Sequence, residues 1–279
     1  MKFLITFLLL LTASLSAFGE RFQTRVHSII RSDEPARPHI VRLENGRVAF
    51  VEKGDARTVF GLQMSRKRGD LVEVDLDGKF RLLSALTLED RRGPAPKRSE
   101  DYGPLLSYEP TVLPSLAAAT AIFRLMRRDH QRDSQCYNRA HVWAYEEFRR
   151  SGLNSQKLFM FFTSRYIWNY NYKWWFHVTP MVLTTEDGAV VERALDRTFT
   201  SRPLLRKAWS DIFIKSKREC PVVRKYSDYE NHQQEEDCYH IPVTMYYWQP
   251  RDIDANERTG AEKTSFIDWE VDWAYDEAF

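Results

Sequence analysis

The chain contains 279 residues, of which 43% are hydrophobic and 29% are charged, an ordinary composition for a globular protein with one large or two small domains. Its formal net charge of +2 gives no electrostatic basis for binding nucleic acid, so that class of partner is excluded. Aromatic residues reach 14%, which fits either a ring-rich core or an aromatic-walled cleft.

The N-terminus has the pattern of a secretory signal peptide. Lys2 precedes a short apolar run over residues 3–11, and the small residues Ala17 and Gly19 fit a cleavage site. The run is too short to span a bilayer, and the rest of the sequence offers no longer one. We therefore expect removal of residues 1–19 and a secreted or periplasmic protein that is not inserted in the membrane.

Residues 20–88 are predicted to form a small β-rich N-terminal domain. The stretch 20–38 is polar without a clear period and is interpreted as a loop. After it, Asn45-Gly46 and Asp77-Gly78 each separate two segments of alternating apolar residues, and such dipeptides are strong signals of β-hairpins. No residue of this domain suggests catalysis.

Residues 89–110 are charged and contain several prolines and glycines, which is typical of a linker. The basic residues between positions 91 and 98 also suit a processing protease. A plain interdomain linker is an equal alternative.

Residues 111–279 are predicted to form an α+β unit. Ser115 can cap a helix that runs to residue 128, and Asp133 or Ser134 can cap a second helix that ends at Ser151-Gly152. Helices followed by antiparallel strands argue for α+β rather than a parallel sheet. The predicted strands cover residues 157–162, 174–183 and 189–195.

The remaining parts of this unit are less regular. Residues 166–172 are interpreted as an aromatic loop, residues 204–214 as a helix and residues 243–248 as a strand. Residues 267–275 alternate between apolar and acidic side chains, which predicts a half-buried strand. A helix is the alternative there, because Trp269 and Trp273 are four residues apart.

The three cysteines divide into a pair and a free thiol. In an exported protein an odd count leaves one thiol over. Cys220 and Cys238 are close together in a polar stretch, and a disulfide between them contributes roughly 3 kcal/mol. That leaves Cys136 in the first turn of the second helix, where backbone N–H groups and the helix dipole favour the thiolate. A buried inert thiol is the alternative.

A nucleophilic thiol needs a base and a group that orients the base. His177 lies in the second predicted strand, and Asp196 ends the third. A turn at Asp187-Gly188 would place Asp196 opposite Thr179, diagonal to His177, and a turn one residue earlier would place the two directly opposite. Either register brings the carboxylate to the imidazole. A packed structural histidine is the alternative for His177, and His141 is interpreted as packed rather than catalytic.

No motif indicates another chemistry. The sequence lacks His-Glu-x-x-His, Gly-x-Ser-x-Gly, a Gly-rich phosphate loop and the Cys/His spacing of a structural zinc site. We therefore expect no metal and no cofactor.

Three segments resemble one known family. Cys136-Tyr137-Asn138-Arg139-Ala140-His141 resembles the Cys-Tyr-x-Arg-Ala-His motif of bacterial protein-glutaminases, also called protein-glutamine deamidases. Trp175-Phe176-His177-Val178 is similar to that family's aromatic-His-Val strand, and Leu195-Asp196-Arg197-Thr198-Phe199 is similar to its hydrophobic-Asp-Pro-Ser-Leu segment. The family's triad maps onto Cys136, His177 and Asp196, the residues that spacing also selects. Arg197 stands where the family pattern has Pro.

The resemblance implies a cysteine-dependent amidohydrolase. Such an enzyme hydrolyses the side-chain amide of glutamine in proteins or peptides to glutamate and ammonia, through a thioester on Cys136 and without a cofactor. The resemblance also implies a core like that of transglutaminases and papain-like proteases, with the nucleophile helix packed on an antiparallel sheet. The alternatives are a transglutaminase or cysteine peptidase with the same triad, and a non-catalytic protein-binding module.

Members of this family are made as zymogens, and the resemblance therefore suggests that residues 20–88 are a pro-region that covers the cleft and is removed. A permanently attached accessory domain is the alternative.

Overall fold

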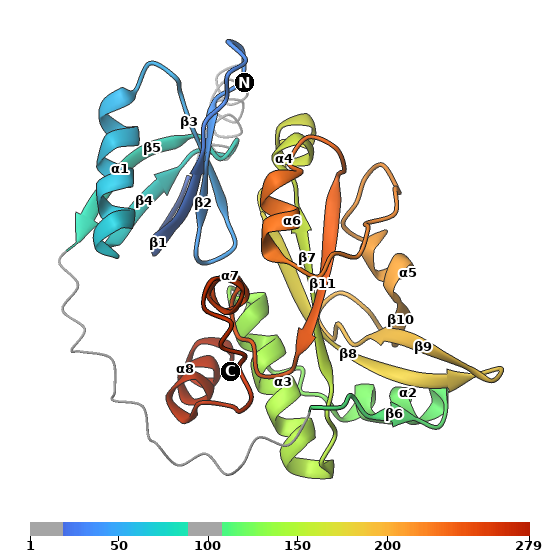
Figure 1. The fold of residues 1–279 in the computed structure, drawn as a ribbon. Helices are drawn as coiled ribbons and strands as arrows, with labels where there is room; N and C mark the ends of the chain where they lie inside the picture. Colours follow the sequence, from blue (N-terminus) through green and yellow to red (C-terminus); the bar gives the residue numbers. More distant parts are fainter. Residues whose placement is uncertain (1–18, 89–107) are drawn as a thin grey trace, which may run out of the picture. The chain divides into compact units, whose positions relative to one another are not determined.

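A computed structural model describes residues 19–88 and 108–279 (Figure 1). Residues 1–18 of the predicted signal peptide and most of the predicted linker lie outside the described residues. The described chain forms two compact units, one of residues 19–88 with Ile167–Trp175, the other of residues 108–166 with Phe176–Phe279. Both units combine helices with a largely antiparallel sheet, which confirms the predicted α+β class.

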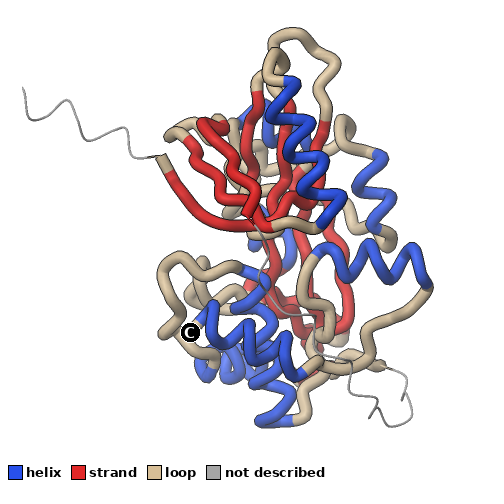
Figure 2. Tube along the Cα trace, turned by 90° about the vertical axis from the view of Figure 1, so that its left-hand side faces the viewer, coloured by secondary structure: helices blue, strands red, loops and turns tan. Residues whose placement is uncertain are grey.

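The first unit is built on a five-stranded antiparallel sheet with strand order β3-β2-β1-β4-β5. Helix α1 (Ala56–Arg68) lies across one face of this sheet (Figure 2). The predicted hairpins are present, β2–β3 around Asn45-Gly46 and β4–β5 around Asp77-Gly78. The strands are β1 (Glu20–Ile30), β2 (His39–Leu43), β3 (Val48–Val51), β4 (Leu71–Leu76) and β5 (Leu82–Leu88).

The prediction of a loop over residues 20–38 is right for 31–38 but wrong for 20–30, because β1 is the central strand of this sheet. Its first part pairs with β4 and its last part with β2, and its register with β2 shifts between Val26 and Ser28. Such a bulge adds a residue to one strand and breaks the alternation of inward and outward side chains. The sequence of β1 therefore shows no clear period of two.

Helix α1 is a feature that the sequence predictions did not contain. Asp55 caps its start by accepting a hydrogen bond from the backbone N–H of Thr58 at 3.1 Å, and Gly69 ends it with φ of 72°. The helix buries Val59, Leu62 and Ser65. With only two buried apolar residues, the sequence of this helix does not show a recognisable helical period of hydrophobic residues.

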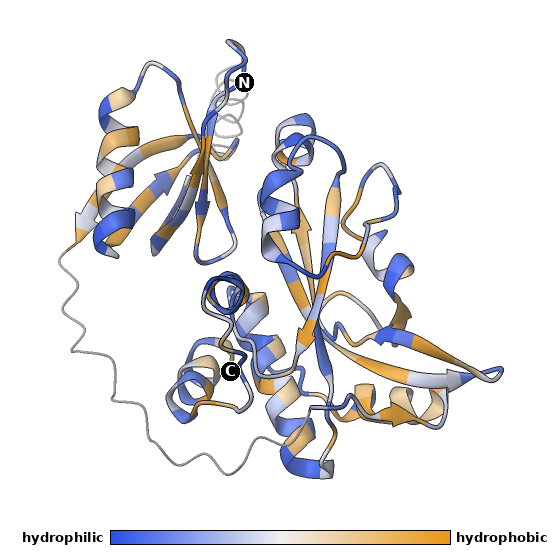
Figure 3. Cartoon of the chain, in the orientation of Figure 1, coloured by the Kyte–Doolittle hydropathy of each residue, from blue (hydrophilic) through white to orange (hydrophobic). Residues whose placement is uncertain are grey.

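The second unit contains a sheet with strand order β10-β9-β8-β7-β11, in which neighbouring strands are antiparallel, and β6 joins β8 in parallel. Helix α3 (Cys136–Ser151) packs against β8 and against α8 (Asp268–Ala278) (Figure 1). Hydrophobic residues predominate along the inner strands (Figure 3). The strands are β6 (Val112–Leu113), β7 (Gln156–Phe162), β8 (Phe176–Glu186), β9 (Ala189–Ala194), β10 (Leu204–Leu205) and β11 (Cys238–Thr244).

Several predicted boundaries of the second unit differ from the structure. The predicted strand at 267–275 is wrong and the helical alternative is right, since α8 buries Glu270, Val271, Ala274 and Ala278 with a helical period. The predicted loop at 166–172, helix at 204–214 and strand at 243–248 are only partly right. The remaining helices are α2 (Leu116–Leu125), α4 (Ser164–Tyr170), α5 (Arg206–Ser210), α6 (Tyr226–Asn231) and α7 (Pro250–Thr259).

Aromatic rings fill the core of the second unit, where Trp143, Tyr166, Trp209 and Tyr229 are almost fully buried. Among the helices that the structure describes, none combines the length and the hydrophobicity needed to cross a membrane.

The structure pairs Cys220 with Cys238 in a disulfide, with Cα atoms 5.0 Å apart, and leaves Cys136 as a free thiol. Cys238 begins the edge strand β11, and Val223 donates a backbone hydrogen bond to His240 of the same strand at 2.9 Å. The disulfide therefore fastens an irregular segment to the edge of the sheet.

Reduction of this disulfide is expected to lower the free energy of unfolding by roughly 3 kcal/mol, because the unfolded chain regains the entropy of an open loop. The measurement is urea unfolding of oxidised and reduced protein, both carrying Cys136→Ala so that the free thiol cannot exchange. Equal stability of the two forms would contradict the prediction.

Candidate active site

Cys136 is the first residue of α3 and is partly exposed. The predicted caps are wrong: Gln135 is the N-cap and makes no side-chain cap hydrogen bond, and the Ser134 hydroxyl instead donates to the Gln131 carbonyl at 2.7 Å. The first N–H groups of α3 thus lack a capping side chain, and the Cys136 sulfur starts the helix beside them. The sulfur therefore lies at the positive end of the helix dipole, next to backbone N–H groups.

Arg139 fixes the turn that precedes Cys136. Its guanidinium donates hydrogen bonds to the carbonyl and to the hydroxyl of Ser134, the latter at 3.0 Å. The residue is only 6% exposed, and electrostatic attraction links its charge to Cys136 and Asp196. The sequence motif includes Arg139, but this supporting contact was not predicted.

His177 lies near the start of β8, opposite Met160 of β7, and is 3% exposed. Its ring stacks on Trp209 with centroids 5.6 Å apart and also contacts Phe199 and Phe213. The imidazole is hydrogen-bonded to Cys136 as well. The surrounding rings hold it in one orientation and exclude water from it.

Asp196 lies two residues after the end of β9, where the β8–β9 hairpin places it beside His177. The turn is Asp187-Gly188, with φ of 51° and 80°, and Met181 pairs with Ala194. This is the first of the two predicted registers, in which Asp196 reaches the level of Thr179. The Asp196 Oδ2 atom lies 2.7 Å from the His177 Nε2 atom.

The Asp196 carboxylate is 2% exposed and has further hydrogen-bond donors. Trp209 donates through its indole N–H to Oδ2 at 2.9 Å, and the backbone N–H groups of Thr198 and Phe199 donate to Oδ1 at 3.3 Å. The backbone donors form a turn around the carboxylate, and this turn contains Arg197. Trp209 was not predicted as a partner, since its position 13 residues later carries no local signal.

Opposite charges in this buried pair shift both pKa values. Burial alone lowers the pKa of His177, but the Asp196 carboxylate and the neighbouring Cys136 raise it to about 9. For Asp196, burial raises the pKa, but His177 and the Trp209 hydrogen bond outweigh it and hold the pKa below its usual value. At neutral pH the pair is therefore an imidazolium and a carboxylate.

This pair predicts how stability depends on pH. The folded pKa of His177, about 9, is above its ordinary value of 6.5, so its stabilising effect is complete below about pH 6.5 and is lost as the pH rises through 9. We compare the free energy of unfolding of the wild type with that of the His177→Gln variant. The difference between the two proteins is expected to be larger at pH 6 than at pH 10, by on the order of 2 kcal/mol. Urea unfolding at several pH values measures this difference.

The matched control for the pH experiment is His232→Gln, which removes a partly exposed imidazole. A pH-independent difference between wild type and His177→Gln would contradict the assignment of the raised pKa to the His177–Asp196 pair.

His141 is packed and hydrogen-bonded, as predicted, and lies apart from the His177–Asp196 pair. Its Nδ1 atom is 2.6 Å from the buried Lys157 Nζ atom, and its ring contacts Trp248 and Phe266. Burial and the Lys157 charge lower its pKa well below the ordinary value. Over residues 19–88 and 108–279, no group of three or more His, Cys, Asp or Glu side chains is arranged to hold a metal ion.

Comparison with known proteins agrees with the segments on which the resemblance rests. Residues 117–213 match a family model described as Glutaminase, and this range contains Cys136, His177 and Asp196. The match confirms the resemblance predicted from the sequence. A search of curated proteins finds no match.

Among solved structures, the chain is similar to pro-protein-glutaminase, with 13% sequence identity, a TM-score of 0.48 and coverage of 84% of each chain. It is also similar to protein-glutaminase from Chryseobacterium proteolyticum, with 14% identity, a TM-score of 0.36, and coverage of 50% of this chain and 77% of that one. A crystal structure of protein-glutaminase gives 14% identity and a TM-score of 0.35, covering 58% of this chain and 84% of that one.

Proposed function

We propose that this chain, which belongs to the protein-glutaminase family over residues 117–213, is an exported enzyme that hydrolyses the side-chain amide of glutamine in proteins or peptides. The observation that carries the proposal is the hydrogen-bonded series Cys136, His177 and Asp196 inside the matched segment. The products are glutamate and ammonia.

The arrangement supports a division of roles among the three residues. The Asp196 carboxylate is hydrogen-bonded to Nε2 of His177, so the other ring nitrogen, Nδ1, is the one available to the Cys136 sulfur. The protonated imidazole would then lie between the Asp196 carboxylate and the Cys136 sulfur, where its charge stabilises the sulfur as the nucleophile. Asp196 fixes the tautomer and the orientation of the ring.

The reaction follows from these roles. The Cys136 thiolate attacks the glutamine Cδ carbonyl, and the backbone N–H of Cys136 at the start of α3 is our candidate donor to the oxyanion. The imidazolium of His177 gives its proton to the departing ammonia. The neutral His177 then takes a proton from water, which attacks the thioester and releases glutamate and the thiolate.

The experiment that tests this proposal is incubation of the protein with a glutamine-containing peptide, followed by an ammonia assay and mass spectrometry. Deamidation adds about one dalton to the peptide, since an amide NH₂ is replaced by OH. An added amine would instead indicate a transglutaminase, and shorter fragments a peptidase. Free glutamine as a parallel substrate tests whether the amide must belong to a peptide.

The absence of ammonia, together with a Cys136 that does not react with an alkylating reagent, would favour a non-catalytic binding module. The disulfide between Cys220 and Cys238 supports export, because such bonds persist in oxidising compartments. Detection of the protein in periplasmic or culture-medium fractions tests this part of the proposal.

We further propose that residues 20–88 are a removable pro-domain. This proposal is supported by the contacts of residues 20–88 with Ile167–Trp175, because that segment leads directly into β8 and His177. Trp175 donates its backbone N–H to the Gly46 carbonyl at 3.0 Å and its indole N–H to the Leu43 carbonyl at 2.8 Å. N-terminal sequencing of the active protein distinguishes a removed pro-domain from a permanent accessory domain.

A further inference from the structure

Two loops of the second unit meet beside the candidate active site. The first connects α2 to α3 and leads into Cys136, and the second follows β9 and contains Asp196. A contact of 3.3 Å between the His130 Nε2 atom and the Thr198 hydroxyl joins the two loops. Residues close to His130 and Thr198 in sequence are therefore brought together next to the triad.

Each loop places an arginine at this junction, Arg128 two residues before His130 and Arg197 directly before Thr198. The Arg197 guanidinium lies over the ring of Phe123 in α2, 4.6 Å from its centroid, which fixes its position. Arg128 is exposed. The two charges are near enough that Arg128 adds to burial in lowering the pKa of Arg197.

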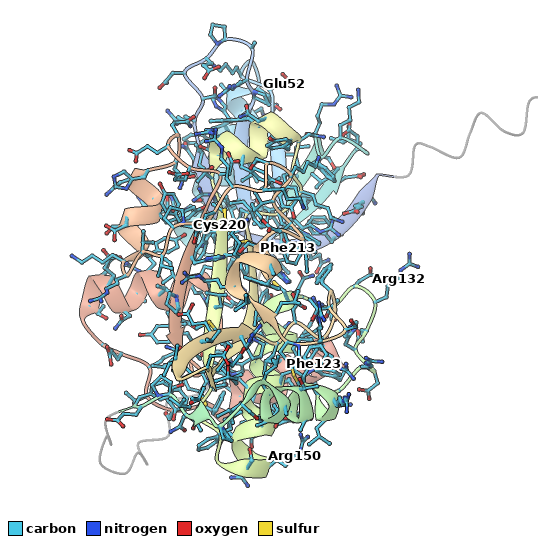
Figure 4. The ribbon with its side chains drawn as sticks, turned by 90° about the vertical axis from the view of Figure 1, so that its right-hand side faces the viewer. Glu52, Phe123, Arg132, Arg150, Phe213 and Cys220 are labelled. Carbon is cyan, nitrogen blue, oxygen red and sulfur yellow. A yellow bond between two sulfur atoms is a disulfide. The ribbon has the colours of Figure 1, made fainter. Side chains whose placement is uncertain are left out.

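No carboxylate of the described residues neutralises either arginine. Neither forms an ion pair within 19–88 or 108–279, and the Arg197 Nε atom is buried without a hydrogen-bond partner. Asp129, the acid next to Arg128, is held by Arg127 at 2.7 Å, and Asp196, the acid next to Arg197, is bonded to His177 and Trp209. Arg132 in the same loop is exposed and points away from the ribbon (Figure 4).

Two like charges that repel each other and lack a counterion form a site for an anion, because a carboxylate that binds both relieves the repulsion and satisfies the open donors. Arg197 directly follows Asp196, and the loop that carries Arg128 leads into Cys136, so such an anion would belong to the molecule that presents its glutamine to the thiol. We propose that Arg128 and Arg197 form a subsite for acidic residues close to the target glutamine, which makes acidic protein segments the preferred substrates. This inference rests on the proposed deamidation.

The test measures peptide binding separately from turnover. Three labelled peptides of equal length carry a central glutamine flanked by glutamate, by serine or by lysine, and their affinities for the full chain with Cys136→Ala are measured by fluorescence anisotropy. We expect the glutamate peptide to bind about tenfold more tightly than the serine peptide at low salt, the effect of two partly exposed ion pairs. The preference is expected to decrease strongly at about 0.3 M salt.

Variants then assign the preference to the two arginines. Arg128→Gln and Arg197→Gln, alone and together, are expected to reduce the glutamate-to-serine affinity ratio, to near one in the double variant. The ratio cancels any general effect of Arg197→Gln on the neighbouring Asp196. The matched control is Arg149→Gln, which removes an exposed arginine near the other end of α3 and is expected to leave the ratio unchanged.

The same ratio is measured for kcat/KM of ammonia release with the Cys136 thiol intact, where the acidic preference is expected to recur. Equal affinity for the three peptides, or a preference that survives in the double variant, would overturn the subsite. Ammonia release without acidic preference would overturn the subsite alone, whereas acidic binding without ammonia release would uphold it and overturn the proposed deamidation.

Discussion

Replacement of Cys136 by alanine is expected to abolish ammonia release, with a rate at least about 10⁴-fold below that of the wild-type protein. The physical reason is that no thioester can form, and activation by His177 and Asp196 has no nucleophile to act on. Ammonia release from a glutamine-containing peptide measures the effect. Alanine is a good helix former and the cysteine is partly exposed, so α3 is expected to remain intact.

Two controls make this result specific. Urea unfolding of the Cys136→Ala variant is expected to stay within about 1 kcal/mol of wild type, which separates lost chemistry from lost structure. Cys136→Ser keeps the shape but replaces the thiol by a far weaker acid, and it is also expected to be inactive. Release of ammonia at the wild-type rate by either variant would contradict the assignment of Cys136 as the nucleophile.

Replacement of Asp196 by asparagine is expected to lower kcat by about 10²- to 10⁴-fold. An amide oxygen at the Oδ2 position can accept from both His177 and Trp209, but the amide NH₂ group then faces the backbone N–H groups of Thr198 and Phe199, which donate to Oδ1 in the wild type. Without the negative charge, burial dominates and the pKa of His177 falls from about 9. The rate is therefore expected to decline at a lower pH than in the wild type.

The pH profile of kcat/KM distinguishes this role from a merely structural one. Trp209→Phe is the matched variant, because it removes one hydrogen bond to Asp196 and keeps the carboxylate charge. We expect it to lower the rate less than Asp196→Asn does and to leave the alkaline limb near pH 9. An Asp196→Asn variant with wild-type rate and pH profile would show that His177 needs no orienting carboxylate.

The positions of Cys136, His177 and Asp196 could be predicted because each follows from local signals. Gly152 ends α3 with φ of 67°, as its sequence position indicates, and the Asp187-Gly188 turn sets the register that brings Asp196 to His177. The distance between two strands joined by a tight turn is a local property of the chain. The meeting of α3 with that hairpin was supplied by the family resemblance.

The groups that support the site could not be predicted in the same way. Trp209 reaches Asp196 from a separate helix, and His130 reaches Thr198 across 68 residues. Such contacts depend on tertiary packing, which periodicity does not encode. The helix over Asp268–Ala278 illustrates the same limit, since the spacing of its aromatic residues fits both a strand and a helix. The buried contact of Glu270 with Lys263, which the sequence does not reveal, distinguishes the two.

The segment Ile167–Trp175 also has a consequence for how the chain comes apart. It lies between β7 and β8 in sequence, yet it belongs to the compact unit of residues 19–88. A cut within residues 89–107 therefore leaves the N-terminal fragment held by hydrogen bonds such as that from Val48 to the Lys173 carbonyl, at 2.9 Å. For the proposed pro-domain, cleavage and dissociation would then be two separate events, with a nicked two-chain complex before any release of the fragment.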